Sequence, residues 1–193
     1  QSSTAATVTN LAELQAAVAA RITAGTPGTI ALRGPTAGSP LGSYSSAGNT
    51  EWNPTGVAVP VGTVIRAADF NDMPEVTGGN VTLGWINVPE NAILDGIKVL
   101  ETTDSIHGLF QVFKNTANRT FRRIFVAGMF SPAGAPYYGI PGNNRVFSLR
   151  AGSNLTVEYC VSYGNSCFVY ADLGASNITT RYNSGHQFGE HFY

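Results

Sequence analysis

Charged side chains are scarce in this chain of 193 residues, because Lys, Arg, Asp and Glu together make up only 12% of it. Helical bundles draw heavily on those residues, so the scarcity disfavours that class. The formal net charge is -1, and nucleic acid binding needs a concentrated basic face. No apolar run reaches the length of a membrane span. We therefore expect neither a nucleic acid partner nor a membrane-spanning segment.

Only two cysteines are present, Cys160 and Cys167. A disulfide across a tight bend is one interpretation if the protein is extracellular. Two small buried hydrophobic side chains are the alternative, which we favour. Because the chain starts at Gln1 rather than Met, we expect either a processed leader or a piece of a longer chain.

Glycine, serine, threonine and asparagine are abundant instead, a composition that suits many short strands joined by turns. Near the N-terminus, Asn10 and Glu13 form a capping pattern ahead of apolar residues at helical spacing, which predicts a helix over 11–23. Strands are expected at 29–33, 57–59 and 63–67. A long surface loop rich in Gly, Pro and Ser is expected over 34–56.

A short phrase recurs in the second half of the chain, each time opening a strand-like run with asparagine. Strong copies begin at Asn91, Asn118, Asn154 and Asn177, and a weaker copy begins at Asn80. Repetition of one supersecondary unit predicts a solenoid, whose units bury their apolar sides against their neighbours. Every copy except the one at Asn91 reads Asn-x-Thr, a glycosylation sequon. Because these sequons coincide with the repeat, we favour a structural role for them over a glycan.

Alignment on the asparagine separates inward from outward positions. The fourth following residue is charged in each strong copy, giving Asp95, Arg122, Glu158 and Arg181. Stacked repeats would place these four in one outward column of alternating sign. The first and third following positions are mostly apolar and should point inward: Ala92, Leu94, Phe121, Leu155, Val157 and Ile178.

Several phrases resemble the pectate-lyase-like superfamily of right-handed parallel β-helix proteins. They are VTNLAELQAAVAARITAGTPGTIALRG from Val8, TVIRAAD from Thr63, NAILDGIKV from Asn91 and NLTVEYCVSYGN from Asn154. The resemblance covers most of the chain and rests on architectural phrases. It implies an all-β fold, a right-handed single-stranded parallel β-helix with an N-terminal capping α-helix. That superfamily includes secreted polysaccharide lyases and hydrolases, phage tailspikes and virion fibres.

On this basis we expect a single domain over residues 1–193. Residues 1–33 would form the N-terminal cap and first strand, and residues 57–193 the coils. A loop insertion is expected near 130–144. A partner subunit, giving a homo-oligomer, or a further domain should cover the C-terminal coil, because bare strand edges and apolar core would otherwise be exposed.

The charged residues of the repeat are also the candidates for catalysis. A β-helix lyase needs a Lys or Arg base beside carboxylates that hold Ca²⁺, and Asp95, Arg122, Glu158 and Arg181 supply both kinds of group. The alternative is a set of surface charges that fixes the register between coils. A hydrolase needs two suitably spaced carboxyls, and Glu158, Asp172 and Glu190 lie in neighbouring late repeats.

A metal site is not indicated. His186 and His191 stand five residues apart around a glycine, whereas helical zinc motifs place two His four apart. On a strand this spacing would put the two rings on opposite faces.

Aromatic residues in the expected loops are the candidates that we favour for ligand binding. Trp52 lies in the first long loop, and Tyr137 and Tyr138 lie in the insertion. Exposed aromatic faces suit the apolar C–H faces of sugars, although these rings would equally suit packing against the solenoid. We favour carbohydrate recognition by an extracellular, secreted or virion-surface protein, such as a tailspike, fibre or adhesin. A polysaccharide lyase or hydrolase, and a purely structural assembly subunit, are the alternatives.

Overall fold

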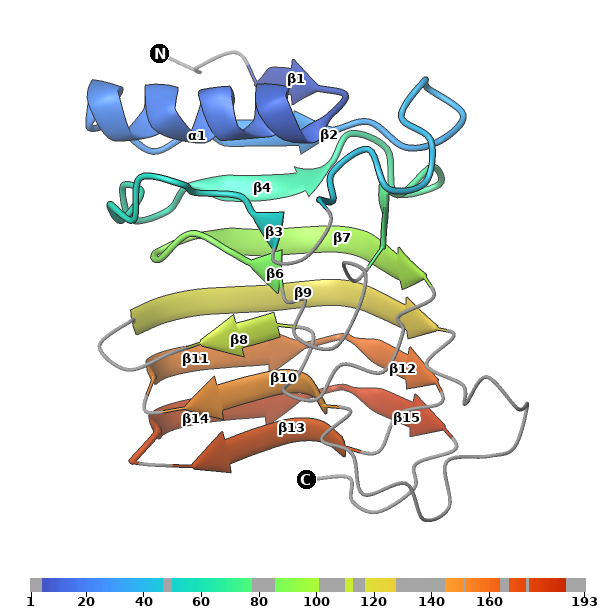
Figure 1. The fold of residues 1–193 in the computed structure, drawn as a ribbon. Coiled ribbons are helices and arrows are strands. Elements are labelled where there is room, and N and C mark those ends of the chain that lie inside the picture. Colours follow the sequence, from blue (N-terminus) through green and yellow to red (C-terminus); the bar gives the residue numbers. More distant parts are fainter. Residues whose placement is uncertain are drawn as a thin grey trace.

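The computed structural model describes residues 5–46, 50–77, 86–100, 110–112, 117–127, 145–150, 152–163, 167–172 and 174–186. These residues form one helix and two sheets in which all the recorded strand pairs are parallel (Figure 1). The described part of the chain is therefore mostly β, with one short helix and a parallel sheet of many strands.

The larger sheet has ten strands. Its main path runs β1 (Ala6–Val8), β2 (Thr29–Leu32), β4 (Val64–Ala67), β7 (Ile93–Leu100), β9 (Ala117–Ala127), β11 (Ser153–Glu158) and β14 (Ser176–Arg181). Beside this path lie β5 (Glu75–Thr77), β12 (Val161–Tyr163) and β15 (Ser184–His186). The smaller sheet has five strands: β3 (Thr50–Glu51), β6 (Ile86–Asn87), β8 (Phe110–Val112), β10 (Arg145–Arg150) and β13 (Cys167–Asp172).

The chain passes back and forth between the two sheets. After β7 it goes to β8 in the smaller sheet, returns to β9 beside β7, and repeats this through β10, β11, β13 and β14. Strands that are parallel neighbours cannot be joined by a tight hairpin, so each needs such a crossover. The aligned repeats become neighbouring strands in register, for example Leu155 opposite Ile178 and Phe147 opposite Phe110.

The helix α1 (Leu11–Ala24) lies beside β1 and β2 at one end of the larger sheet (Figure 1). The Asn10 side chain accepts the Glu13 N–H at 3.0 Å, as an N-cap does. The Glu13 carboxylate reaches back to the backbone N–H of Thr9 at 2.7 Å, one residue before the expected partner. Gly25 adopts φ 63° and closes the helix end. The prediction of a helix over 11–23 is confirmed to within one residue.

The core lies between the two sheets. Phe121 of the larger sheet meets Phe110 and Phe147 of the smaller one, with ring centroids 5.2 and 5.0 Å away, and the centroids of Phe110 and Phe147 are 5.3 Å apart. Such aromatic clusters contribute about 0.5–1.5 kcal/mol per pair beyond the area they bury. The inward positions of the repeat are buried as expected, except that Ile178 on the edge strand β14 is only half-buried.

Two sequence expectations for the N-terminal half need correction. Residues 57–59 form no strand, although Val59 is buried and its N–H donates to the Glu90 carbonyl at 3.1 Å. The segment 34–56 is not purely a surface loop, because it buries two aromatic side chains, Tyr44 and Trp52. The Tyr44 hydroxyl and the Trp52 Nε1–H both donate to backbone carbonyls, and these hydrogen bonds offset the free-energy cost of burying the two polar groups.

The repeated asparagine has a conformational cause. Asn91, Asn118, Asn154 and Asn177 all have φ between 52° and 69°, the left-handed region that asparagine tolerates better than most side chains. Their amides also stack between neighbouring strands. Asn118 Nδ2 donates to Asn91 Oδ1 at 3.2 Å, and Asn177 Nδ2 donates to Asn154 Oδ1 at 3.0 Å. The turn therefore explains these residues without a glycan.

A second left-handed residue stands five places after each asparagine: Gly96, Arg123, Tyr159 and Tyr182. It interrupts the strand alternation. Between the buried Phe121 and Ile124 lie two successive outward residues, Arg122 and Arg123. The three later repeats thus present two neighbouring side chains on the outer face where an ordinary strand presents one, whereas the repeat at Asn91 has glycine at the second position.

We predict that Asn154→Ala lowers the free energy of unfolding by about 1–2 kcal/mol, because alanine resists the left-handed conformation and the amide bond to Asn177 is lost. Asn154→Gly should cost less than Asn154→Ala, as urea unfolding would measure. Ser153 is the matched control, since its φ is not positive. There glycine should cost more than alanine, and the same order at both positions would contradict the conformational explanation.

Candidate functional site

The charged column predicted from the repeat exists in the structure. Strand register places Asp95 opposite Arg122, Arg122 opposite Glu158 and Glu158 opposite Arg181. It also adds Arg66, opposite Asp95 on β4. The signs alternate along all five members. Opposite charges on neighbouring strands favour this register over a slipped one.

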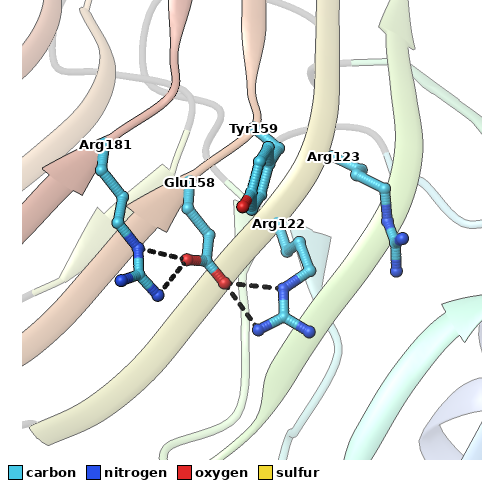
Figure 2. Close-up of a pocket in the computed structure, with 5 residues that line it drawn as sticks. All are labelled: Arg122, Arg123, Glu158, Tyr159 and Arg181. Carbon is cyan, nitrogen blue, oxygen red and sulfur yellow. Dashed lines mark hydrogen bonds and ion pairs between the residues drawn. The ribbon is translucent and has the colours of Figure 1, made fainter.

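Glu158 is held between two arginines (Figure 2). Arg122 donates to Oε1 from Nε at 2.7 Å and from Nη2 at 2.6 Å. Arg181 donates to Oε2 from Nε and Nη2, both at 2.7 Å. The Glu158 side chain is 2% exposed, while those of Arg122 and Arg181 are 37% and 53% exposed. The carboxylate is therefore saturated with donors, and the guanidinium groups keep a face in solvent.

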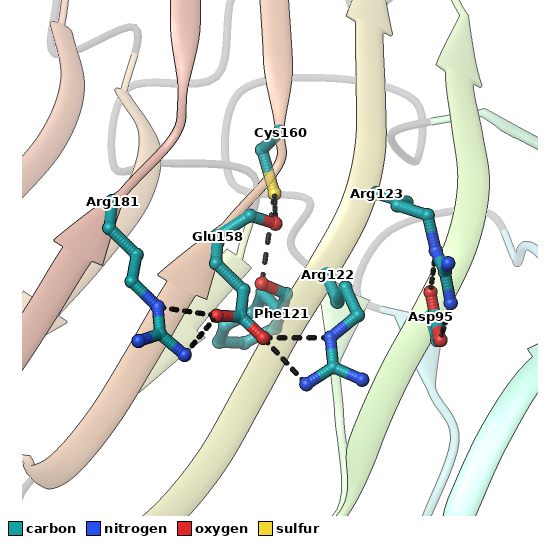
Figure 3. Close-up of polar contacts among 7 residues, drawn as sticks. All are labelled: Asp95, Phe121, Arg122, Arg123, Glu158, Cys160 and Arg181. Carbon is teal, nitrogen blue, oxygen red and sulfur yellow. Dashed lines mark hydrogen bonds and ion pairs between the residues drawn. The ribbon is translucent and has the colours of Figure 1, made fainter.

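Asp95 is paired differently from Glu158 (Figure 3). Its partner is Arg123, whose Nε donates to Oδ1 at 2.6 Å and whose Nη2 contacts Oδ2. The Arg123 guanidinium also lies 4.3 Å from the centroid of the Phe70 ring, a cation–π distance. The same ring covers Gly96, where an added Cβ would stand 2.4 Å from Phe70 Cε1. The contact with Phe70 therefore favours glycine at this turn, whereas the other copies have Arg or Tyr in the same left-handed conformation.

The ion pairs shift the pKa values of three groups in and beside the column: Glu158, Arg123 and Arg181. Burial raises the pKa of Glu158, but hydrogen bonds and charge from Arg181 and Arg122 outweigh it and hold the pKa below its ordinary value of 4.5. The bond to Asp95 raises the pKa of Arg123, and the bond to Glu158 raises that of Arg181. A carboxylate that is ionised at neutral pH cannot supply a proton there, and guanidinium groups whose pKa is raised cannot accept one.

Two tyrosines at the second left-handed position form an exposed stack. The rings of Tyr159 and Tyr182 have centroids 4.9 Å apart and an interplanar angle of 18°. They are 51% and 68% exposed. The Arg181 guanidinium lies 5.8 Å from the Tyr182 centroid. An apolar face of two stacked rings thus stands beside the charged column.

Arg122, Arg123, Glu158, Tyr159 and Arg181 line an open pocket of about 640 Å³ (Figure 2). We call these five residues together with Tyr182 the arginine–tyrosine surface. Its three guanidinium groups face two buried carboxylates, Glu158 within the surface and Asp95 beneath Arg123, so the local charge stays positive by one. Such a surface suits a ligand with negative charges and flat apolar faces.

The two tyrosines were not predicted from the sequence, although a signal exists. Aligning the fifth position after each asparagine gives Gly96, Arg123, Tyr159 and Tyr182. The copy at Asn91 has glycine at this position, which is typical of a turn. A bulky residue at the same position of a later copy must therefore point its side chain away from the strand.

The aromatic residues that we predicted to bind carbohydrate are Trp52, Tyr137 and Tyr138, and the structure describes only Trp52. Trp52 is fully buried, and its Nε1 donates to the Tyr44 carbonyl at 3.1 Å. The prediction that Trp52 offers a face to a sugar is therefore wrong, because packing in the core satisfies both the ring and its N–H. Tyr137 and Tyr138 lie outside the described residues.

The column does not fit the Ca²⁺ chemistry expected of a lyase. Calcium needs several oxygen ligands together, whereas Asp95 and Glu158 each have guanidinium partners. Among the described side chains, no three of His, Cys, Asp or Glu gather as a metal group. Glu190 and His191 lie outside the described residues, as do the side chains of Asp172 and His186. Neither a hydrolase pair nor a histidine pair is therefore tested.

Cys160 is a buried, free thiol, which confirms the hydrophobic interpretation for that residue. Burial raises the pKa of this thiol to about 12, so it is un-ionised and unreactive at neutral pH.

No protein-family model, curated protein or solved structure matches this chain. In the parts of the chain that the structure describes, no helix is long and apolar enough to cross a membrane. The functional argument therefore rests on the geometry of the arginine–tyrosine surface.

We predict that Glu158→Gln lowers the free energy of unfolding by about 1–3 kcal/mol at pH 7, because it removes charge-assisted bonds to two arginines. The folded-state pKa of Glu158 lies below 4.5, so this stabilisation is fully present above about that pH. It is lost as the pH falls through the folded value. Urea unfolding of both proteins across pH 3–7 would measure a difference that shrinks on acidification.

Glu75→Gln is the matched control, since Glu75 makes one looser pair with Lys98 at 3.7 Å. It should cost below about 1 kcal/mol. An equal cost for the two variants would contradict the special role of the buried carboxylate.

Proposed function

We propose that this chain is a right-handed parallel β-helix that recognises an anionic glycan, extracellularly or at a virion surface, through the arginine–tyrosine surface. The observation that carries the proposal is the exposed stack of Tyr159 and Tyr182 beside three guanidinium groups. Both rings remain largely exposed to solvent, so among the described residues their outer apolar faces are not fully covered. A sugar chain offers both apolar faces and hydrogen-bonding edges to cover it.

The coil architecture is supported by the strand order. Successive circuits of the chain alternate between two parallel sheets and advance by one strand. Connections between parallel strands of one sheet are almost always right-handed. The helix α1 beside β1 and β2 occupies the place of a capping element. The sequence resemblance to pectate-lyase-like proteins agrees with this arrangement.

The spacing of the arginines supports an extended ligand. Arg122 and Arg181 lie on β9 and β14, with β11 between them. Two strand spacings of ~4.8 Å place their backbones roughly 10 Å apart. A linear polysaccharide that runs across the strands would meet one guanidinium at β9 and another at β14. Carboxylate or sulfate groups on alternate sugars would then pair with both.

Binding without cleavage is the activity that this chemistry supports. Glu158 accepts four donor contacts from two arginines and has a depressed pKa. It is thus a positioning group for Arg122 and Arg181. In this proposal its role is to hold both guanidinium groups in place before the ligand arrives, which lowers the entropy cost of binding.

We predict that Arg181→Ala weakens binding to polygalacturonate or alginate by about tenfold, the expected effect of losing one charge-assisted bond. Affinity electrophoresis in gels that contain the polysaccharide would measure this. Neutral dextran should retard neither protein. Arg33→Ala is the matched control, because Arg33 is exposed and lies outside the surface.

Equal retardation of wild type and Arg181→Ala would remove this surface from the binding site. The same incubations report on the lyase alternative. Unsaturated products or new reducing ends, abolished by Arg122→Ala, would replace binding by catalysis as the function.

We also predict that Tyr182→Ala weakens polysaccharide binding by about three- to tenfold, whereas Tyr182→Phe retains it, because stacking needs the ring rather than its hydroxyl. Isothermal titration with oligosaccharides of the same polymer would separate the variants. Binding that depends on the hydroxyl instead would contradict the stacking role.

A further inference from the structure

Arg119 occupies a position that the repeat reserves for apolar side chains. It follows Asn118 directly, as Ala92 follows Asn91 and Leu155 follows Asn154, and strand register sets it opposite Leu155. The residue is only 5% exposed. A guanidinium in this inward column is costly unless it has partners.

The partners of Arg119 are incomplete within the described residues. Its Nε donates to the Val88 carbonyl at 2.8 Å. Its Nη1 is buried and has no hydrogen-bond partner there. Burial lowers the pKa of Arg119 to about 10, although the charge of Glu90 opposes the shift. The guanidinium therefore stays charged at neutral pH and keeps at least one donor to offer.

A pocket of about 160 Å³ lies against this arginine. Its walls come from two turns and the start of β9: Asn53, Gly56, Asn87, Val88, Pro89, Glu90 and Arg119. At ~30 Å³ for each water, the space holds about five water molecules or a small polar ligand of that size. The pocket shares no residue with the arginine–tyrosine surface.

The wall chemistry selects the class of ligand. Arg119 and Glu90 contribute one charge of each sign, so a bound anion would add uncompensated charge next to the glutamate. A carboxylate has room for several donors, whatever other contacts Glu90 makes. A hydroxyl group both donates and accepts, and two adjacent hydroxyls can serve an arginine and a carboxylate together. Val88 and Pro89 add an apolar wall for C–H groups.

We propose that this pocket binds the vicinal diol of a neutral polyol, such as one unsubstituted sugar ring. One hydroxyl oxygen accepts an N–H of the Arg119 guanidinium, and the neighbouring hydroxyl donates to Glu90. This is a second site, distinct in place and in ligand charge from the anionic site proposed above.

Saturation-transfer NMR with glycerol, xylose, glucose and galactose tests the proposal on the full chain, with acetate as the anionic probe. Gly56→Asn adds a side chain to the pocket wall, and asparagine tolerates the φ of 68° at that position. Gly25→Asn is the matched control, because Gly25 has φ 63° and equally open space but lies at the end of α1. Arg119→Met removes the donor and keeps an apolar side chain in the column.

The expected result is a signal from at least one neutral polyol in wild type and in Gly25→Asn. That signal should fall about tenfold or more in Gly56→Asn and Arg119→Met. No polyol signal in wild type, or an undiminished signal in Gly56→Asn, would overturn the proposal. So would acetate binding at this pocket in place of a polyol.

Discussion

Parallel pairing in strict register is the constraint on which this structure depends. Each strand of the larger sheet that opens with the repeated asparagine must bend at the same two points, or its neighbours among these strands could not follow it. Left-handed residues make both bends, at the repeated asparagine and five places later. The hydrogen-bonded amides, the charged column and the stacked tyrosines are all consequences, because equal bends bring equivalent side chains of neighbouring strands together.

The two proposed sites show opposite uses of a buried charge. Glu158 is buried, and both of its carboxylate oxygens accept hydrogen bonds from arginines. Its charge therefore holds two guanidinium groups whose outer faces remain in solvent. Arg119 is buried and incompletely paired among the described residues, so it keeps a donor for something else. Burial alone distinguishes neither case. The count of partners does, because a desolvated charge is stable only when its hydrogen-bonding capacity is filled.

Much of this arrangement could be predicted from the sequence, and the failures have physical reasons. Spacing from the asparagine located the column of Asp95, Arg122, Glu158 and Arg181, since register follows directly from a repeated turn. The position of Trp52 could not be predicted, because a Gly- and Ser-rich segment says nothing of whether its few aromatic residues fold inward. The sequence also did not indicate that Arg119 stands among apolar side chains, because a charged residue at one inward position looks like an ordinary break in the pattern.

The alternating signs of the column limit how this chain can change in length. Arg66, Asp95, Arg122, Glu158 and Arg181 occupy successive strands of the larger sheet. Loss of the single strand that carries Glu158 would bring two arginines face to face, whereas loss of two consecutive strands would leave every remaining neighbour opposite in sign. Like charges on adjacent strands are destabilising. We therefore expect duplication or deletion to be tolerated most easily in steps of two repeats, since only an even step keeps every pair of neighbouring charges opposite in sign.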